Sequence, residues 1–352
     1  MGDTYPKLKV AAVQAAPVFL DREATVDKAC RLILEAGREG ADLVVFPECF
    51  IAAYPAWHNF YPARHPQCLR FGQEMFKNAV EIPSPATQRL CQSAQQANTY
   101  VVMGLNERRR GMMGTLYNSQ LFIHRQGTIL GKRQKLMPTS TERLVHGLGD
   151  GRGLRVFPTE YGALGGLICS ENGNPLYRFA LLSQGEVLHA ASWPSFANPY
   201  GSGYSREAML LRMRNYAWEG RVFIVSAAEI FTEEIADILE LDRDTRLSIK
   251  EMGGYSAIVN PNGKIIAGPA EYGETIVYAD IDLEEIIDLR MHQDYTGHYN
   301  RFDVVSLNYH PSPYVPLRHM PAPVTTPHEE WAAAETLDRE TPLPIEKPMG
   351  DP

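Results

Sequence analysis

The sequence has no long basic block and no long apolar run. Its longest run of Lys and Arg is Arg108–Arg110, and the 352 residues carry a formal net charge of −8. Because phosphate backbones are bound by basic patches, we expect no nucleic-acid partner. No apolar run approaches the ~20 residues that a helix needs to cross a bilayer, so we expect no membrane partner either.

Cysteine pairs are also missing. The five cysteines are odd in number, form no Cys-x-x-Cys pair and show no His-rich spacing typical of a metal site. This pattern favours a reduced, cytoplasmic setting and gives no reason to expect a metal or another cofactor. The first residues lack the charged segment and apolar core of a secretory signal, which agrees with a cytoplasmic protein.

What the sequence does contain is an alternation of strands and helices. Residues 8–14 are apolar enough for a buried strand, a helix capped by Asp21 follows and ends at Gly40, and residues 43–46 form a second apolar run before Pro47. Strand, helix and strand in this order form the βαβ unit of α/β proteins. With 44% hydrophobic residues, the chain can bury a large core.

The alternation continues along the chain. We expect helices over 85–97, 174–184 and 205–219, strands over 100–104, 187–191 and 222–226, and hairpins with arms 117–124 and 128–134, 153–157 and 163–169, and within 255–267. Two sheets, each carrying helices on its outer face, accommodate this mixture. Ten of the 25 prolines lie in residues 311–352. We therefore divide the chain into a folded domain, 1–310, and a proline-rich tail, 311–352, that cannot continue a sheet.

Three residues with reactive side chains follow predicted strands. Cys169 ends the apolar run 163–169, Glu48 comes directly after Phe46-Pro47, and Lys135 follows the second arm of the first hairpin. Taken singly, such a cysteine is usually a small core residue, and such a Glu or Lys is usually solvated. For Cys169, the helix expected from residue 174 would turn N–H groups and a positive dipole end towards the sulfur and favour the thiolate.

Together the three side chains supply what attack on a carbon–nitrogen bond requires. A nitrile carbon is a poor electrophile, and a thiolate is the most nucleophilic side chain near neutral pH. Because the ordinary pKa of a thiol is ~8.5, a base or a cation must lie beside the sulfur. Glu48 can take the proton if burial raises the pKa of its carboxyl, and Lys135 can stabilise the negative nitrogen that develops after attack.

The segments that carry these residues resemble the three signature segments of the nitrilase superfamily of carbon–nitrogen hydrolases. Phe46-Pro47-Glu48, Lys135-Leu136-Met137-Pro138-Thr139 and Cys169-Ser170-Glu171-Asn172 follow one another in the family's order, with spacings of 87 and 34 residues between the reactive side chains. Three ordered motifs are far more specific than one. The resemblance covers residues 8–305 and implies an α-β-β-α sandwich, with Glu48 as base, Lys135 as oxyanion-type stabiliser and Cys169 as nucleophile.

The resemblance also assigns Glu142, seven residues after Lys135, as a second glutamate that helps to orient the lysine and the substrate. Two positions depart from the family's usual pattern. Ser170 follows the cysteine where Trp or Gly is most common, and Cys49 follows the glutamate in place of Ala. We expect Ser170 to be tolerated as a small residue and Cys49 to be inert.

The candidate substrate-binding residues follow strand ends, in segments that resemble family loops lining the substrate pocket. They are Tyr54, Trp57, Asn172, Trp193 and Phe196. Enclosure by aromatic rings favours an aromatic nitrile or an arylacetonitrile as the small-molecule substrate, with water as the second reactant. The same rings could equally belong to the core. Aliphatic nitriles, and cyanide itself as in a cyanide hydratase or dihydratase, remain open.

Other functions are less favoured. An aliphatic amidase or carbamoylase of the same superfamily would use the same three residues on a carbonyl group, but Asn172 followed by Pro175-Leu176 favours the nitrilase branch. An inactive binding protein on this fold would lack one of the three reactive residues. A dinucleotide-binding enzyme would carry Gly-x-Gly-x-x-Gly after the first strand, and the sequence does not.

Two further segments contain histidine. His189 lies in a predicted apolar strand, where we expect a hydrogen-bonded core residue. Gly297-His298-Tyr299 resembles a family segment that takes part in subunit packing. The resemblance therefore implies a homo-oligomer, built from dimers and able to grow into spirals.

Overall fold

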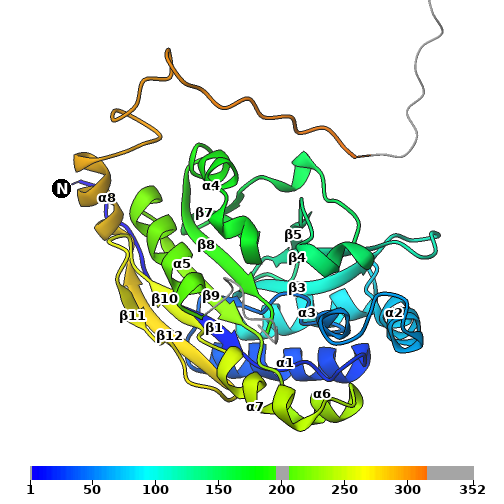
Figure 1. The fold of residues 1–352 in the computed structure, drawn as a ribbon. Helices are drawn as coiled ribbons and strands as arrows, with labels where there is room; N and C mark the ends of the chain where they lie inside the picture. The colour runs from blue at the N-terminus through cyan, green and yellow to red at the C-terminus, as the bar shows by residue number, and fades with distance from the viewer. Residues whose placement is uncertain (1, 196–205, 315–352) are drawn as a thin grey trace, which may run out of the picture. The chain divides into compact units, whose positions relative to one another are not determined.

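The structure is a computed structural model that describes residues 2–195 and 206–314, and for residues 248–252 it describes only the backbone. Within this part, two six-stranded sheets pack against each other (Figure 1). Phe196 and residues 315–352 lie outside the described residues, so the extent of the tail stays a prediction.

The first sheet has the strand order β12-β1-β2-β3-β4-β5. Strands β1, β2 and β3 are parallel, while β12, β4 and β5 pair with their neighbours in antiparallel fashion. The bounds are β12 (Thr275–Asp282), β1 (Lys7–Gln14), β2 (Leu43–Val45), β3 (Tyr100–Arg108), β4 (Leu116–Ile123) and β5 (Ile129–Gln134). Because β4 reverses direction and β5 reverses it again, β2 and β5 end at the same edge of the sheet.

The second sheet has the order β11-β10-β9-β8-β7-β6. Strands β7, β8 and β9 are parallel, and the remaining strands pair antiparallel. The bounds are β11 (Ile265–Ala267), β10 (Ala257–Val259), β9 (Phe223–Ala228), β8 (Glu186–Trp193), β7 (Gly162–Ile168) and β6 (Phe157–Thr159).

Helices cover the outer face of each sheet (Figure 1). Helices α1 (Arg22–Arg38) and α3 (Pro85–Ala97) pack on the first sheet, and α4 (Pro175–Leu182) and α5 (Arg206–Gly220) pack on the second. Asp21 begins α1 as predicted, since its side chain accepts a hydrogen bond from the Ala24 N–H at 2.9 Å. The remaining helices are α2 (Pro66–Asn78), α6 (Glu233–Ile238), α7 (Arg243–Met252) and α8 (Glu284–His292).

The alternation of side chains along β1 shows why this arrangement forms. Val10 and Ala12 are buried in the cluster between the two sheets, whereas Ala11 and Val13 are buried against the helices of the first sheet. Both faces of the strand are therefore apolar, which requires a layer on each side. The predicted α-β-β-α sandwich is confirmed.

One predicted hairpin is shifted. Its first arm is Phe157–Thr159 rather than 153–157, because Gly151–Gly153 form a 3₁₀ turn that Asp150 caps through the Arg152 N–H. The second arm begins at Gly162, as expected. Helices α2, α6, α7 and α8 and strand β12 were not predicted from the sequence.

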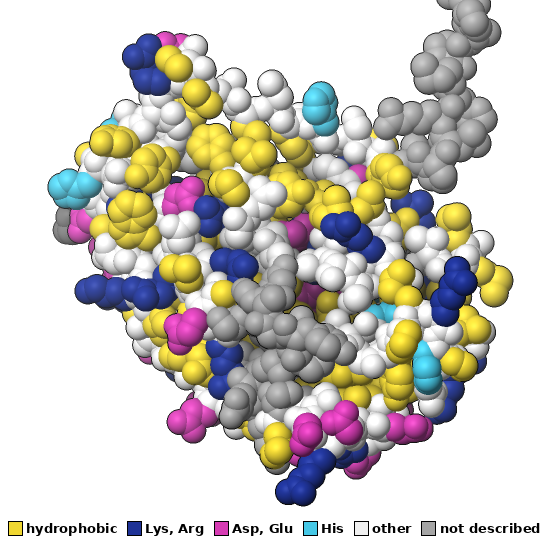
Figure 2. All heavy atoms as spheres, viewed as in Figure 1, with side chains coloured by type: hydrophobic (Ala, Val, Ile, Leu, Met, Phe, Trp, Pro, Cys, Tyr) yellow, Lys and Arg dark blue, Asp and Glu magenta, His cyan; other side chains and the backbone are white. Residues whose placement is uncertain are grey.

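Two observations concern the surface of the described residues. No helix among them is both long enough and apolar enough to span a membrane. On the face drawn in Figure 2, Lys and Arg side chains lie among Asp and Glu side chains rather than in one block.

Candidate active site

The three predicted reactive residues lie at strand ends where the two sheets meet. Glu48 follows β2, Lys135 follows β5 and Cys169 follows β7. The Glu48 N–H donates to the carbonyl of Trp193 in β8, at 3.2 Å. Two residues earlier, the carbonyl of Phe46 accepts from the Ser192 hydroxyl at 2.8 Å. The segment that carries Glu48 therefore bridges the first sheet to the second.

A glycine makes room for this segment. A Cβ on Gly104 in β3 would lie 1.9 Å from the carbonyl oxygen of Pro47, so only glycine lets the Glu48 segment pass over β3. Beyond Glu48 the backbone is strained, with φ of +50° at Cys49, +72° at Ala52 and +77° at Ala53. Non-glycine residues keep such angles only where surrounding contacts hold them, and such residues cluster at functional sites.

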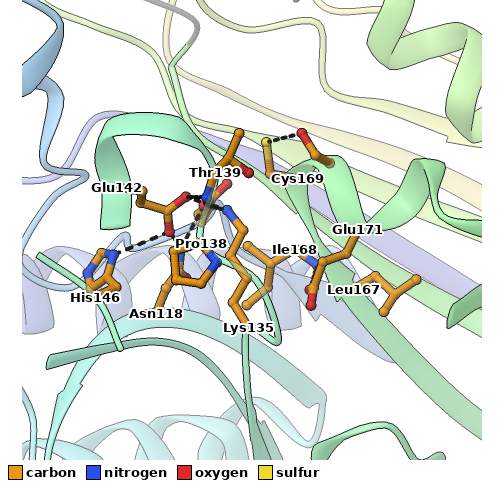
Figure 3. A network of polar contacts seen from close by, with 12 residues as sticks. Asn118, Lys135, Pro138, Thr139, Glu142, His146, Leu167, Ile168, Cys169 and Glu171 are labelled. Atoms are coloured by element: carbon orange, nitrogen blue, oxygen red, sulfur yellow. Dashed lines mark hydrogen bonds and ion pairs between the residues drawn. The ribbon is translucent and has the colours of Figure 1, made fainter. Parts of the chain in front are cut away.

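Lys135 lies between two carboxylates. Its Nζ is 2.7 Å from Glu48 Oε1 and 2.7 Å from Glu142 Oε2, and all three side chains are buried. Asn118 in β4 joins the same carboxylates from the other side, because its Nδ2 donates to Glu48 Oε1 at 2.6 Å and to Glu142 Oε1 at 2.7 Å. Figure 3 shows Lys135 and Asn118 beside Glu142, with Cys169 close by. The structure thus brings together Glu48, Lys135 and Glu142 as predicted.

Burial and the neighbouring charges give the side chains of this cluster different pKa values. Burial raises the pKa of Glu48 to about 7, and the charge of Glu142 adds to the rise, although Lys135 and Asn118 oppose it. Burial also acts to raise the pKa of Glu142, but Lys135 and His146 outweigh it and the pKa is lowered. Burial alone would lower the pKa of Lys135, yet Glu48 and Glu142 raise it well above 10.5. Near neutral pH, Glu48 is therefore the member that exchanges a proton, while Lys135 stays charged.

The two carboxylate oxygens of Glu48 differ in their hydrogen bonding. Lys135 and Asn118 both bind Oε1, whereas buried Oε2 has no hydrogen-bond partner among the described residues. A buried carboxylate oxygen without a donor is costly and marks a place where a proton or a ligand is bound in turn.

Cys169 begins a short 3₁₀ turn, Cys169–Gly173, with φ of +52° and 5% of its surface exposed. Burial and, to a lesser extent, the charge of Glu48 raise the pKa of its thiol to about 12, although Lys135 opposes the rise. The effects of Glu48, Lys135 and Glu142 on this thiol show that the sulfur shares their buried surroundings.

The expected thiolate is therefore wrong for the resting protein. The first N–H groups of α4 are bound by the side chain of Asn174, which accepts from Leu176 and Tyr177 at 3.0 and 3.4 Å, so they are not turned to the sulfur. The charge of Lys135 and the Ser170 hydroxyl, whose oxygen lies 3.7 Å from the sulfur, both lower the pKa of the thiol, but burial and the charge of Glu48 outweigh them. A thiol whose pKa is raised must lose its proton before it can act as a nucleophile, which requires a neighbouring base.

A buried ion pair fastens the lysine segment to the cysteine segment. Glu171 Oε1 accepts from the Leu136 N–H at 2.8 Å, and Oε2 accepts from the Ile168 N–H at 3.0 Å. Arg133 in β5 lies against both oxygens, at 2.9 Å from Oε1 and 2.8 Å from Oε2. Lys135 directly precedes Leu136 and Cys169 directly follows Ile168, so the Glu171 carboxylate ties together the main chain beside both residues.

The sequence matches the carbon–nitrogen hydrolase family over residues 9–291. The chain belongs to this family. It is 38% identical over 317 residues to a nitrilase of Bacillus sp. (strain OxB-1), covering 90% of this chain and 92% of that protein. It is also 38% identical over 332 residues to an aliphatic nitrilase of Rhodococcus rhodochrous, covering 94% of this chain and 88% of that protein.

A solved structure supports the fold. Nit3 of Saccharomyces cerevisiae, a member of branch 10 of the nitrilase superfamily, matches with a TM-score of 0.64 at 23% identity, over 82% of this chain and 95% of that one. The family match and the two nitrilase relatives confirm the predicted superfamily, and the structural match shows that the sandwich is shared with Nit3.

Residues that sequence reasoning missed support the charged cluster of this carbon–nitrogen hydrolase. His146 Nδ1 lies 3.2 Å from Glu142 Oε1, and its Nε2 lies 2.7 Å from Asn106 Oδ1. Glu229, at the end of β9, is buried, and burial raises its pKa well above 4.5, with a further rise from the charge of Glu48. Asn118 lies in the predicted arm 117–124, whereas Asn106 lies in the part of β3 beyond the predicted strand 100–104, and nothing in the sequence indicates what either side chain faces.

The predicted substrate-binding residues of the hydrolase have different surroundings. Burial raises the pKa of Tyr54 well above 10, and the nearby charges of Glu142 and Glu48 raise it further, so its phenol lies by the cluster. Trp57 is fully buried with Phe71, their ring centroids 5.5 Å apart. Trp193 is fully buried in the cluster that contains Cys169. As substrate contacts, these three stay predictions.

Asn172 and Phe196 complete that set. The amide of Asn172 is fully buried and is engaged by the carbonyls of Leu167 and Cys169 and by His189, so the structure gives it an internal role rather than a free face towards a ligand. Phe196 lies outside the described residues.

Proposed function

We propose that this carbon–nitrogen hydrolase is a nitrilase that converts a nitrile and two waters to a carboxylic acid and ammonia. The observation that carries the proposal is the buried cluster in which Lys135 bridges Glu48 and Glu142, 2.7 Å from each, within the electrostatic reach of the Cys169 thiol. The 38% identity with two nitrilases over most of the chain supports it.

The first half of the reaction forms a covalent intermediate. The Cys169 sulfur attacks the nitrile carbon while Glu48 Oε2, which no described residue occupies, takes the thiol proton. Negative charge develops on the nitrile nitrogen, which Lys135 stabilises and which receives the proton from Glu48 to give a thioimidate. The pKa of Glu48, about 7, suits a group that both takes and returns a proton near neutral pH.

The second half releases the products. Water, activated by Glu48, adds to the thioimidate carbon, and the tetrahedral adduct expels ammonia to leave a thioester at Cys169. A second water, activated in the same way, hydrolyses the thioester to the acid and restores the thiol. Glu142 keeps the Lys135 ammonium in place throughout, since its lowered pKa keeps it a carboxylate.

The substrate we propose is an aromatic nitrile or an arylacetonitrile. Tyr54 supports this choice because its ring lies by the charged cluster. Trp57 and Trp193 support it less, because both are fully buried. One of the relatives at 38% identity is named an aliphatic nitrilase, so short alkyl nitriles are the direct competitors in the test.

The test is a panel of benzonitrile, phenylacetonitrile, butyronitrile and cyanide, with ammonia, acid and amide measured for each. We expect ammonia and acid in equal amounts from at least one arylnitrile, and no turnover by Cys169→Ala. Cys91→Ala serves as the matched control, since Cys91 is buried on α3 in the core of the first sheet. Turnover of a nitrile by Cys169→Ala at the parental rate would refute the mechanism.

The same assay separates the rival activities. An amidase or carbamoylase would release ammonia from benzamide or phenylacetamide faster than from the matching nitrile. A hydratase would accumulate amide, because its tetrahedral adduct expels the thiolate instead of ammonia. A cyanide hydratase or dihydratase would prefer cyanide over every organic nitrile.

We also propose that the enzyme is a cytoplasmic homo-oligomer. Large apolar side chains are exposed on α4 and α5, among them Leu176, Leu211 and Trp218 with 59%, 67% and 43% of their surface exposed. An apolar surface of this kind is typical of an interface between subunits. Light scattering coupled to size exclusion should give a mass at least twice the monomer's.

A further inference from the structure

A chain of four buried side chains leads from α5 to the turn that carries the nucleophile. The Tyr216 hydroxyl donates to Glu186 Oε2 at 2.5 Å, and Glu186 Oε1 lies 2.7 Å from Nδ1 of His189. On the other side of the ring, His189 Nε2 lies 2.8 Å from Oδ1 of Asn172. All four residues are fully buried, so no solvent competes for these hydrogen bonds.

The chain ends on the main chain of the nucleophile. Asn172 Nδ2 donates to the carbonyl of Cys169 at 3.0 Å and to the carbonyl of Leu167 at 3.2 Å. These two carbonyls flank the point where β7 ends and φ turns to +52° at Cys169. A cysteine keeps this φ angle only when its surroundings impose it. The side chain of Asn172 contributes to this by binding the Cys169 carbonyl.

The directions of these hydrogen bonds indicate that His189 fixes the orientation of the Asn172 amide. Because Nδ2 of Asn172 faces two carbonyls, its Oδ1 must face His189, and His189 Nε2 must carry a proton. A second proton lies between Nδ1 of His189 and the carboxyl of Glu186. If Nε2 no longer donated, Asn172 would lose the partner that fixes the orientation of its amide.

Strand β7 leaves room for this series of hydrogen-bonded side chains. A Cβ on Gly165 in β7 would lie 1.8 Å from Oε1 of Glu186, so a glycine is required where the carboxyl packs. The Glu186 carboxyl thus fills a space that β7 leaves for it, opposite the ring of His189.

The first sheet contains the same arrangement. His146 lies between Glu142 Oε1, at 3.2 Å, and Asn106 Oδ1, at 2.7 Å. Nδ2 of Asn106 donates to the carbonyls of Ala53 and Ile51, at 2.8 and 3.2 Å. These carbonyls belong to the strained segment that follows Glu48. A Glu–His–Asn chain therefore holds the main chain near the base as well as near the nucleophile.

We propose that His189 is a positioning residue for the nucleophile: through Asn172 it holds the Cys169 main chain in its left-handed conformation and so sets where the sulfur lies. This inference rests on the proposed function, in which Cys169 attacks the substrate. It assigns to a histidine in the core of β8 a role in the rate of attack, with no contact to the substrate.

Two variants distinguish the role of Nε2 of His189 from that of Nδ1. In His189→Gln the side-chain nitrogen takes the place of Nε2 and still donates to Asn172. In His189→Asn it takes the place of Nδ1, donates to Glu186 and leaves Asn172 without a donor. Each variant loses one buried hydrogen bond, so their melting temperatures should fall by similar amounts.

The readouts are kcat and KM on the nitrile that the panel selects, and the rate at which iodoacetamide alkylates Cys169, followed by mass spectrometry of its peptide. We expect His189→Asn to lose about 10- to 100-fold in kcat, as expected for a reacting group misplaced by about 1 Å, with KM unchanged and alkylation slowed in parallel. His189→Gln should stay within about threefold of the parent in both readouts, as a rescue by the variant that keeps the relevant donor.

Equal kcat values for the two variants, or an alkylation rate that does not follow kcat, would overturn the proposal. If His189→Asn does not fold, Tyr216→Phe keeps the packed ring and removes only the hydroxyl that holds Glu186. It should lower kcat several-fold at unchanged KM, and parental values in both readouts would again overturn the proposal. Cys169→Ala tests the function separately: turnover by that variant refutes the nitrilase mechanism, whereas loss of turnover together with a parental His189→Asn refutes only the role of His189.

Discussion

Replacing Glu48 by Gln should inactivate the enzyme and yet stabilise its fold above neutral pH. Gln keeps the shape of the side chain, and its carbonyl oxygen can still accept from Lys135 and Asn118 as Glu48 Oε1 does. What disappears is a buried negative charge and the proton acceptor at Oε2. Removal of a general base costs about 10²- to 10⁴-fold in kcat.

The stability change follows from the pKa of Glu48, which burial raises from 4.5 to about 7. Because the folded protein holds this proton more tightly than the unfolded chain does, ionisation of Glu48 destabilises the fold. The cost is absent below pH 4.5, grows between pH 4.5 and 7, and is complete above pH 7. At ~1.36 kcal/mol for each pH unit, it reaches about 3 kcal/mol.

Urea denaturation of parent and variant at pH 4.5 and pH 8 measures this cost. Other titrating groups are common to both proteins, so the difference between the two free energies of unfolding isolates Glu48. We expect Glu48→Gln to gain about 3 kcal/mol relative to the parent between pH 4.5 and pH 8. A difference that stays constant with pH, or a variant that becomes relatively less stable at pH 8, would refute the reasoning.

The same pKa predicts the acid side of the activity profile. Glu48 must be a carboxylate to take the thiol proton, so kcat/KM should rise with pH through about 7. Because the pKa of the Cys169 thiol is about 12, ionisation of this thiol should cause no further change in kcat/KM below pH 10. A rate that is already maximal at pH 5 would show that the base is another group.

Three further changes test the cluster and its support. Lys135→Met leaves the carboxylates of Glu48 and Glu142 buried without their shared cation, which should cost about 3–5 kcal/mol of stability in urea denaturation; a variant as stable as the parent would contradict the bridging position. Asn118→Ala removes the donor to Glu48 Oε1 that lowers its pKa, so the acid limb of kcat/KM should move to higher pH; an unmoved limb would exclude Asn118 from the electrostatics. Gly104→Ala places a Cβ 1.9 Å from the Pro47 carbonyl and should lower kcat about 10²-fold by displacing Glu48, whereas Gly72→Ala in α2, where a Cβ meets nothing within 4 Å, should leave kcat unchanged.

The strands and helices of both sheets were largely predictable because their signals are local. The cap at Asp21, the breaker at Pro47 and the apolar runs before Glu48 and Cys169 act within a few residues of where they stand. The hairpin arm placed at 153–157 was wrong because Asp150 captures the Arg152 N–H and forms a turn there. Such side chain to main chain competition is hard to weigh from a pattern.

The sequence by itself determined the chemistry: a thiol, a carboxyl and an amine, each placed directly after a strand. The tertiary structure alone decided their proton affinities, because these depend on burial and on charges that come from distant segments. Asn118 reaches Glu48 across 70 positions of sequence, and Arg133 meets Glu171 across 38. Contacts of that range depend on how strands pair and how two sheets pack, and hydrophobic periodicity does not encode either. That is why burial raises the pKa of the Cys169 thiol, and why His189 faces Asn172, whose amide binds the Cys169 carbonyl.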